Sequence, residues 1–325
     1  MASALAALMS RPNLPLAPHA SPIDELSRLR KALGRTCPRL LMKRDDLLSF
    51  AMGGNKVRKM QAVAAEALAD RADALITCGG VQSNHARVTA ATGAALGMKV
   101  VLVVNGPRPE HMTGNALLDQ LFGADVRYVS SRDLRAPAME EAAVEMRAAG
   151  RRPWIVPLGA STVSGALGFA RGVTELAASS FRPDVIVHSS SSGGTQAGLI
   201  VGCALLGLTA RVLGISADDP APQLTAIVQR LIAEAGATLG AAPHTIGADR
   251  AIDVDDTFVG EGYGRPTPES TEALQLVART EGIVLDPVYT AKAMAGLIAR
   301  IRRQDFGPDD TILFWHTGGQ TGLFA

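Results

Sequence analysis

The chain alternates between short, uninterrupted apolar runs and longer stretches with helical periodicity. The apolar runs predict strands over 74–77, 100–104, 126–129, 154–157, 185–188, 211–216 and 311–315. The stretches between them predict helices over 57–69, 83–96, 137–149, 195–206, 269–280 and 290–302. Strands without polar alternation are buried on both faces, as in parallel sheets. The pattern therefore predicts an α/β fold with one or two doubly wound open sheets, whose ligands bind where strands end.

Three segments depart from this regular alternation. Residues 237–264 have the weakest patterning, which predicts long loops. Residues 185–210 carry no formal charge, but a Ser/Gly break at 189–194 favours strand, loop and buried helix over a membrane span. Residues 1–10 are apolar without a charged leader, so a capping helix is expected in place of a secretion signal.

Composition narrows the class of protein. With 47% hydrophobic and 19% charged residues over 325 positions, the chain is globular. A net charge of +1 gives no basic footprint for nucleic acid or an anionic membrane. The cysteines are Cys37, Cys78 and Cys203. They form no CxxC pair, which fits a reducing cytoplasm. Asp253, Asp255 and Asp256 lack neighbouring ligands at metal spacing, so a polar strand edge and no metal is predicted.

Lysine and tyrosine are scarce, and one lysine stands at a strand-to-helix junction. Lys56 follows Gly53 and Gly54 and precedes a helical pattern, with Arg58 and Lys59 close by. The helix dipole and these cations would lower the pKa of Lys56 towards that of an amine able to form a Schiff base. A solvated basic turn is the alternative, and a bare Gly-Gly-Asn-Lys sequence favours that ordinary explanation. Lys43, beside two aspartates, is expected to be paired.

A second junction has the composition of an anion cradle. The apolar run 185–188 enters a Ser/Gly loop that contains Ser192, Gly193, Gly194 and Thr195, and a helix follows. Backbone N–H groups and a helix N-terminus would then face an anion, most often phosphate. The loop is neither a Walker A motif nor a GxGxxG motif, and a flexible turn is the alternative.

Other polar residues follow strands or lie in Gly/Pro-rich loops. Ser83 and Asn84 follow the run 74–77 at positions typical of helix caps, and the free N–H groups there would also suit a substrate carboxylate. Tyr263 and Tyr289 lie in loop-like contexts, which favours a functional role, whereas Tyr128 on a predicted strand is structural.

A lysine for covalent attachment, a phosphate cradle and a carboxylate-binding helix end together indicate a pyridoxal phosphate enzyme. The chain resembles the fold type II enzymes of this class (tryptophan synthase β-like), and within them the 1-aminocyclopropane-1-carboxylate deaminase and D-cysteine desulfhydrase family. The motifs that carry the resemblance are 43–46, 53–59, 82–85, 192–195, 261–264, 286–289 and 316–319. Each motif alone has little specificity. Their shared order over nearly the whole chain carries the resemblance.

The resemblance implies roles for individual residues and a domain division. Lys56 would hold pyridoxal 5'-phosphate covalently, and the residues that would contact the cofactor are Asn84, Ser192, Gly193, Gly194, Thr195, Thr290 and Thr317. The substrate carboxylate would lie against Ser83, Asn84 and His85, with Tyr263 and Tyr289 at the reacting face. Residues 1–56 and 166–325 would form a large cofactor-binding domain. Residues 57–165 would form a small domain that closes over the substrate, in a homodimer.

Two threonines separate the branches of this family. The deaminases it resembles carry glutamate where this chain has Thr290 and leucine where it has Thr317, while D-cysteine desulfhydrases match this chain at both. A neutral hydroxyl beside the ring nitrogen gives a milder electron sink than a carboxylate, which suits loss of a β-thiolate better than cyclopropane opening. We therefore expect α,β-elimination from a small β-substituted amino acid, D-cysteine first, giving pyruvate, hydrogen sulfide and ammonia.

Several alternatives remain open at this stage. They are elimination from L-cysteate or another β-substituted amino acid, the cyclopropane deaminase reaction, and a non-catalytic protein that stores the cofactor. The sequence also leaves open the D or L preference and whether Lys56 or Tyr289 removes the Cα proton.

Overall fold

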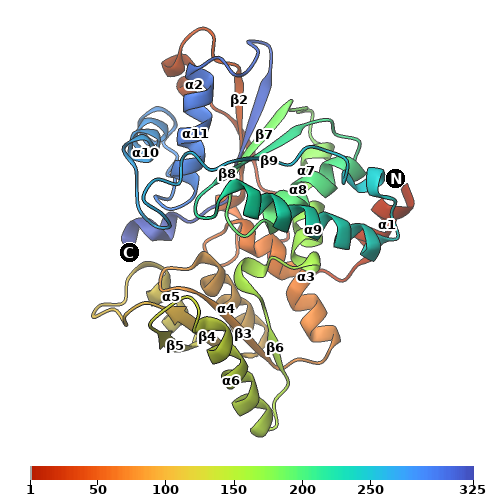
Figure 1. The fold of residues 1–325 in the computed structure, drawn as a ribbon, viewed down its shortest axis with the longest axis vertical. Helices are drawn as coiled ribbons and strands as arrows, with labels where there is room; N and C mark the ends of the chain where they lie inside the picture. The colour runs from red at the N-terminus through yellow and green to blue at the C-terminus, as the bar shows by residue number, and fades with distance from the viewer. Residues whose placement is uncertain (1) are drawn as a thin grey trace.

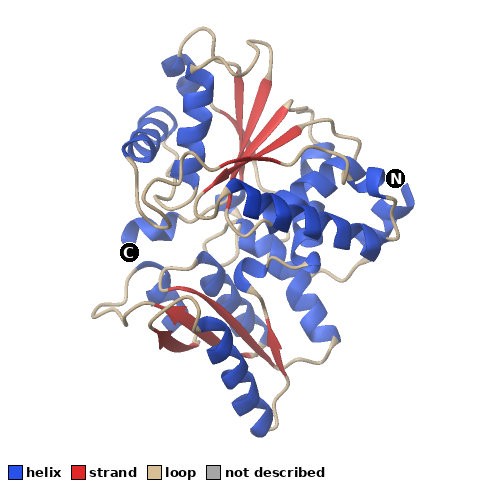
Figure 2. Cartoon of the chain, in the orientation of Figure 1, coloured by secondary structure: helices blue, strands red, loops and turns tan. Residues whose placement is uncertain are grey.

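The computed structural model describes residues 2–325. The strands of this region form two sheets (Figures 1 and 2). The strands are β1 (Ile23–Glu25), β2 (Arg39–Arg44), β3 (Ala74–Gly80), β4 (Lys99–Asn105), β5 (Asp125–Val129), β6 (Pro153–Ile155), β7 (Val185–Ser190), β8 (Arg211–Ser216), β9 (Asp253–Asp255) and β10 (Thr311–His316). The larger sheet has the order β1-β2-β10-β7-β8-β9, and the smaller sheet has the order β5-β4-β3-β6. Only the β1–β2 pairing is antiparallel among the described strands.

Helices cover the sheets and join their strands. They are α1 (Ala2–Ser10), α2 (Ser27–Leu33), α3 (Asn55–Ala69), α4 (Asn84–Leu96), α5 (Gly114–Leu121), α6 (Arg135–Ala148), α7 (Val163–Ala178), α8 (Gly194–Leu205), α9 (Ala221–Leu239), α10 (Pro268–Glu281) and α11 (Thr290–Arg302). Single 3-10 turns are η1 (Asp45–Leu47), η2 (Leu158–Ala160), η3 (Pro243–Ile246) and η4 (Gln320–Phe324). This is the predicted α/β architecture with two doubly wound sheets.

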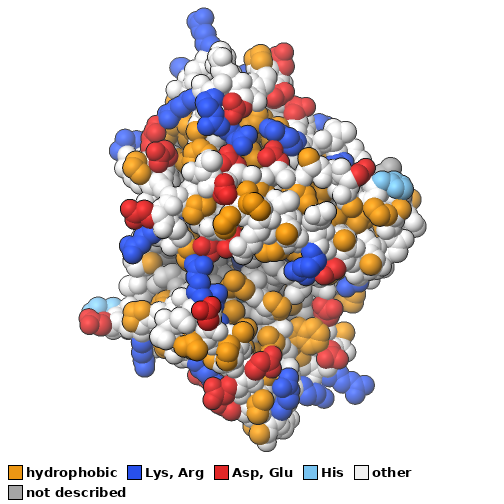
Figure 3. Space-filling view, viewed as in Figure 1, with side chains coloured by type: hydrophobic (Ala, Val, Ile, Leu, Met, Phe, Trp, Pro, Cys, Tyr) orange, Lys and Arg blue, Asp and Glu red, His pale blue; other side chains and the backbone are white. Residues whose placement is uncertain are grey.

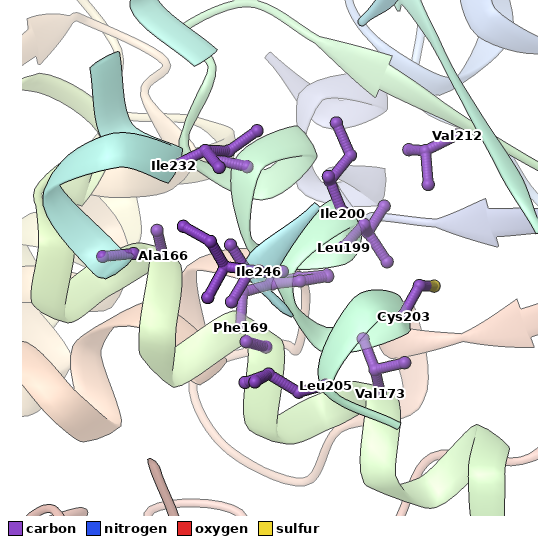
Figure 4. Close-up of a cluster of buried hydrophobic side chains, with 14 of the residues drawn as sticks. Ala166, Phe169, Val173, Leu199, Ile200, Cys203, Leu205, Val212, Ile232 and Ile246 are labelled. Atoms are coloured by element: carbon purple, nitrogen blue, oxygen red, sulfur yellow. The ribbon is translucent and has the colours of Figure 1, made fainter. Parts of the chain in front are cut away.

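The larger sheet is buried on both faces, which explains its uninterrupted apolar strands. The register aligns Leu41, Leu313, Ile186 and Val212 in one row across four strands. This row packs against α7, α8 and α9, where side chains from all three helices interdigitate (Figure 4). The neighbouring row packs on the opposite face against α2, α10 and α11. Both faces therefore require apolar residues, and alternation with polar ones is lost.

The smaller sheet repeats this arrangement with fewer strands. Leu75 pairs with Val100 and faces α3 and α4, whereas Ile76 pairs with Val101 and faces α6. All four strands of this sheet lie between residues 74 and 155. The strands of the larger sheet lie before and after that segment.

Every apolar run predicted as a strand overlaps one, and every predicted helix is present. The window 185–210 is β7, a loop and α8, as expected, and no helix within residues 2–325 combines the length and apolar character needed to cross a bilayer. The predicted ranges left out the strands β1, β2 and β9 and the helices α2, α5, α7 and α9. The many small residues of α7 hide its periodicity, and α9 reaches into the segment predicted as loops. The division at 56/57 and 165/166 stays a prediction, because α3 and α7 pack together across it.

Candidate active site

A pocket of about 940 Å³, part of it open to solvent, is lined by residues of both sheets at the carboxyl ends of β3, β7 and β10. It brings together the predicted site residues Lys56, Ser83, Asn84, His85, Ser192, Gly193, Thr195, Tyr263, Tyr289 and Thr317. These residues come from segments up to 261 positions apart in the chain, from Lys56 to Thr317. The strand ends on which sequence reasoning concentrated therefore converge on one cavity, as expected for open α/β sheets.

Lys56 lies in the first turn of α3 and faces the pocket. Burial lowers the pKa of Lys56 from its ordinary value of 10.5 to about 8, and a hydrogen bond with Lys59 partly opposes this effect. The Lys56 side chain is only half-buried, because its amine faces the pocket, which is partly open to solvent. A lysine with this pKa carries a substantial neutral fraction near physiological pH, which a Schiff base requires.

The predicted direction of the Lys56 pKa is confirmed, but the physical cause differs from the prediction. Arg58 does not approach the amine: its guanidinium donates to Asp45 and Glu175. Lys59 does approach it, but its hydrogen bond with Lys56 raises the pKa of Lys56 and does not lower it. Desolvation, and not repulsion between cations, therefore activates Lys56.

A buried ionic cluster of Lys43, Asp45, Arg58 and Glu175 anchors the base of α3. Arg58 bonds to both carboxylates at 2.6–2.9 Å, and the Trp315 indole donates to Asp45 Oδ2 at 2.7 Å. Lys43 is paired, as expected, but its partner is Glu175 at 2.6 Å and not one of the aspartates beside it in the sequence. The cluster fixes the helix that carries Lys56 to the larger sheet.

The Ser/Gly loop joins β7 to α8 and forms the predicted cradle. Gly193 is the N-cap of α8 and adopts a left-handed conformation, with φ of +75°. The first turn of α8 therefore presents backbone N–H groups without intrahelical partners. The Ser192 hydroxyl accepts a hydrogen bond from Ser161 at 2.7 Å, and Thr195 Oγ1 accepts one from Asn55 at 2.9 Å. Both side chains are thereby held at the pocket wall.

The N-terminus of α4 forms the facing wall. Ser83 caps the helix by accepting from the Ala86 N–H, so the cap expected from sequence is present. His85 is 2% exposed and its Nε2 bonds to Thr77 at 2.7 Å. Its Nδ1 has no hydrogen-bond partner within residues 2–325. Burial lowers the pKa of His85 well below its ordinary value, so the ring is neutral.

Tyr263 and Tyr289 meet at the pocket, where their hydroxyl groups are hydrogen-bonded to each other. Burial raises the pKa of Tyr263 and raises that of Tyr289 well above its ordinary value. Both phenols are therefore protonated near neutral pH and can donate a proton. Tyr128 lies on β5 and packs in the core of the smaller sheet, as expected of a structural residue.

The two threonines that separated the family branches occupy different environments. Thr317 lines the pocket, and its hydroxyl makes no hydrogen bond in the described chain. Thr290 is fully buried and does not line the pocket. Its hydroxyl donates to Asp286 Oδ1 at 2.6 Å and accepts from the Asp286 N–H at 2.8 Å. The expectation of direct cofactor contact by Thr290 is therefore corrected to an indirect role, in which it fixes Asp286 next to Tyr289.

Opposite charges meet at the mouth of the pocket. Arg132 precedes α6 and pairs with Asp218, which follows β8, at 3.1 Å. The same guanidinium lies 5.2 Å from the centre of the Tyr263 ring. The pair thus links the two sheets across the opening. Elsewhere on the face shown in Figure 3, charges of both signs are interspersed.

The comparisons with known proteins decide the family. Residues 15–318 match the model of the family described as "Pyridoxal-phosphate dependent enzyme". The chain belongs to that family. It is 40% identical to the D-cysteine desulfhydrase of Yersinia pestis (strain Pestoides F), over 97% of this chain and 96% of that protein. It is also 40% identical to the D-cysteine desulfhydrase of Serratia proteamaculans (strain 568), with the same coverage.

Solved structures agree with this assignment. A structure described as an ACC deaminase homologue is 36% identical, with a TM-score of 0.91 over 100% of this chain and 97% of that one. A pyridoxal 5'-phosphate-dependent aspartate racemase is 16% identical, with a TM-score of 0.70 over 98% of this chain and 94% of that one. The latter likeness shows the fold alone. The protein is therefore a fold type II pyridoxal phosphate enzyme.

The residues of the pocket fit this cofactor. The Ser189 hydroxyl is buried beside the cradle without a hydrogen-bond partner in the described chain. A Cβ atom on Gly194 would lie 2.9 Å from Lys59 Nζ, so glycine lets the loop approach this amine. A Cβ on Gly159 would lie 2.4 Å from Ser192 Oγ and 3.4 Å from Lys56 Nζ. Glycine at these positions keeps open a space bounded by an amine, hydroxyl groups and a helix N-terminus, which suits a phosphate.

Sequence reasoning missed two lysines that serve this site. Lys59 bonds to the Gly159 carbonyl and to Ser161, and it could supply positive charge to a phosphate. Lys292 is buried and donates to the carbonyls of Val259 and Gly262, which fixes the loop before Tyr263. The spacing of Lys59, three residues after Lys56 on one helix, was the available signal. For Lys292 the sequence offered none.

Proposed function

We propose that this enzyme is a D-cysteine desulfhydrase, which converts D-cysteine and water to pyruvate, hydrogen sulfide and ammonia. The observation that carries the proposal is the near-full-length similarity to D-cysteine desulfhydrases, at 40% identity. The pocket supports it with a low-pKa lysine that faces two protonated tyrosines.

Pyridoxal phosphate, when bound, supplies an aldehyde for covalent attachment and an electron sink for the carbanion at Cα. We propose that Lys56 attaches it and that Ser192, Gly193, Gly194, Thr195 and Lys59 hold its phosphate. The unpartnered hydroxyl of Thr317 and the amide of Asn84 are available to polar atoms of the ring.

The substrate carboxylate would bind at the N-terminus of α4. The Ser83 hydroxyl oxygen already accepts from the Ala86 N–H, so its proton is available to a carboxylate oxygen. His85 and the first N–H groups of the helix belong to the same wall of the pocket. The positive end of the helix dipole favours an anion there.

The pKa directions divide the proton transfers between Lys56 and the tyrosines. A base must be unprotonated, and the pKa of Lys56 of about 8 allows this near neutral pH. The raised pKa of Tyr289 keeps its phenol protonated. We therefore assign removal of the Cα proton to the Lys56 amine, and assign donation of a proton to the departing thiolate sulfur to the Tyr263–Tyr289 pair.

A deaminase acting on 1-aminocyclopropane-1-carboxylate is the second candidate, since the most similar structure cited above carries that description. The neutral surroundings argue against it. Thr290 replaces the glutamate of those deaminases, and Asp218 at the mouth is the one acidic residue that lines the pocket in the described chain. Without a carboxylate to keep the ring nitrogen protonated, the electron sink is milder.

A panel of substrates tests the proposal. Pyruvate and sulfide release would be measured for D-cysteine, L-cysteine, L-cysteate, β-chloroalanine and D-serine, and 2-oxobutyrate for 1-aminocyclopropane-1-carboxylate. We expect the highest kcat/KM with D-cysteine. A preference for L-cysteate or for the cyclopropane substrate would transfer the enzyme to another branch of the family. Cofactor binding without turnover of any of them would indicate a storage protein.

We further propose that the enzyme is a cytoplasmic homodimer. The three buried, unpaired cysteines support a reducing compartment. The dimer follows from the family resemblance. Size-exclusion chromatography with light scattering tests it, and a monomer at micromolar concentration would contradict it.

A further inference from the structure

Arg87 is a buried arginine behind the pocket wall, and the chemistry proposed above does not use it. It lies on α4, one turn after Asn84, with 1% of its surface exposed, and it does not line the pocket. Among the described residues, no carboxylate lies within 4 Å of its guanidinium to form a salt bridge. Asp119 and Asp286 act on its charge without forming a salt bridge, so hydrogen bonds to uncharged groups hold this buried cation.

The guanidinium connects four segments that are far apart in the sequence. Nη1 lies 2.9 Å from Asn84 Oδ1, 2.8 Å from Asn115 Oδ1 and 2.7 Å from Thr321 Oγ1. Nη2 donates to the Gly53 carbonyl at 3.0 Å. These acceptors belong to the start of α4, the start of α5, the C-terminal turn η4 and the loop that precedes Lys56.

One consequence concerns the orientation of the Asn84 amide. Its Oδ1 accepts from Arg87 and also from Asn115 Nδ2 at 3.0 Å. A flipped amide would turn its own donors towards two other donors, so this network fixes Oδ1 inward. The Asn84 Nδ2 group has no hydrogen-bond partner within residues 2–325 and remains for the pocket that Asn84 lines.

The other consequence concerns the lysine loop. Gly53 lies three residues before Lys56 and has a left-handed φ of +69°. A Cβ there would lie 2.4 Å from the Asp46 carbonyl oxygen, so the loop is tightly packed on one side. Arg87 holds the Gly53 carbonyl from the other side. The Arg87 guanidinium therefore fixes both the loop that precedes Lys56 and the Asn84 amide that faces the cofactor ring.

We propose that Arg87 is a positioning residue, which holds Lys56 and the Asn84 amide in fixed relation around the bound cofactor. The proposal rests on the proposed attachment of the cofactor to Lys56. Because Arg87 touches neither cofactor nor substrate, its loss should change how the cofactor titrates and how fast the chemistry proceeds more than it changes substrate affinity.

The test compares the wild-type holoenzyme with Arg87→Lys and Arg87→Met. Arg300→Met is the matched control, because Arg300 is a partly buried arginine that pairs with Asp255 away from the pocket. The first readout is the pH midpoint of the visible absorbance of the lysine-attached cofactor. We place the free Asn84 Nδ2 donor at the 3-oxygen of the cofactor ring, where it favours the ionised oxygen, so Arg87→Met should raise this midpoint by roughly one pH unit.

Steady-state kinetics with D-cysteine give a second readout. We expect Arg87→Met to lower kcat roughly tenfold with less than about a threefold change in KM, and Arg87→Lys to fall between it and wild type. Arg87→Lys keeps the charge and the aliphatic stem, and it decides the question if Arg87→Met does not fold. A wild-type midpoint and kcat in the folded variants would overturn the proposal, as would an equal change in Arg300→Met.

Hydrogen–deuterium exchange of the protein stripped of cofactor gives a third readout that does not depend on the proposed function. Amides of residues 53–56 and of Asn84 should exchange roughly tenfold faster in both Arg87 variants than in wild type or Arg300→Met. If the wild-type protein lacked the visible absorbance of the attached cofactor, the proposed attachment to Lys56 would be wrong. Hydrogen–deuterium exchange would still test whether Arg87 positions the two segments. Unchanged exchange at these amides would refute that role.

Discussion

Replacing Lys56 with methionine should stabilise the cofactor-free protein below pH 8. The folded protein holds the Lys56 amine in a partly dehydrated pocket, which lowers its pKa from 10.5 to about 8. That difference corresponds to roughly 3 kcal/mol. Pocket water screens part of it, so we expect Lys56→Met to be more stable than wild type by about 2 kcal/mol at pH 7.

The sign of the pH dependence follows from proton binding. Between pH 8 and 10.5 the unfolded chain keeps the Lys56 proton and the folded chain has lost it, so wild-type stability rises with pH. Below pH 8 both states are protonated and the full cost of the buried ammonium remains. The advantage of Lys56→Met should therefore be constant below pH 8 and shrink towards zero as pH approaches 10.5.

Urea unfolding of the cofactor-free proteins at pH 7, 8, 9 and 10 measures this difference. Lys31→Met, at an exposed position on α2, is the matched control and should not change with pH relative to wild type. The wild-type holoenzyme serves as a second control, because covalent attachment of the cofactor removes the free Lys56 amine. A Lys56→Met protein that is less stable than wild type at pH 7, or a difference that stays constant up to pH 10, would refute desolvation as the cause of the low pKa.

Three further substitutions test the site. Tyr289→Phe removes a proton donor and should lower kcat for D-cysteine about 100-fold with little change in KM, measured by pyruvate release. Lys292→Met leaves two carbonyls without their donor, so the loop before Tyr263 should loosen, with a several-fold higher KM and a loss of about 1–3 kcal/mol in urea unfolding. Asp218→Asn removes a partly exposed ion pair with Arg132 and should change stability by less than about 0.5 kcal/mol, while KM becomes less sensitive to salt.

Each of these expectations has a control and a contrary result. Tyr128→Phe, outside the pocket, should retain wild-type kcat, and wild-type kcat in Tyr289→Phe would remove the phenol from the mechanism. An unchanged KM in Lys292→Met would show that its loop does not position substrate. For Asp218→Asn, a KM that follows ionic strength as in wild type would exclude a role for the ion pair at the pocket mouth.

The sequence predicted those parts of the fold that arise from local patterns. Strands such as β7 and β10 contain uninterrupted apolar runs because both faces of the sheet are covered, and this requirement is visible in the chain itself. By contrast, α7 is surrounded by other helices on several sides, so its small residues show no polar face. The edge strands β1 and β9 have three residues each, and so short a strand shows no recognisable pattern of apolar and polar residues.

For the site, the sequence located residues at strand ends but not the residues that support them. Lys56 and the Ser/Gly loop stand at junctions that any α/β sheet brings together. Glu175 and Arg87 lie within helices and act through partners more than a hundred positions away. Thr290 was assigned to the cofactor because it occupies the position of the glutamate in the deaminases that the chain resembles, but its hydroxyl bonds to Asp286 and does not face the pocket.

The ionic cluster under α3 also has a consequence for how this enzyme can vary in evolution. Each single change at Asp45, Arg58 or Glu175 leaves a buried charge uncompensated, which costs about 3–5 kcal/mol. Joint replacement of these three and of Lys43, the fourth member of the cluster, by apolar side chains of matching volume removes all the charges at once, and such changes are often neutral in other proteins. These positions should therefore show strong epistasis. Single substitutions should abolish folding, whereas distant sequences should differ at all the positions of the cluster together.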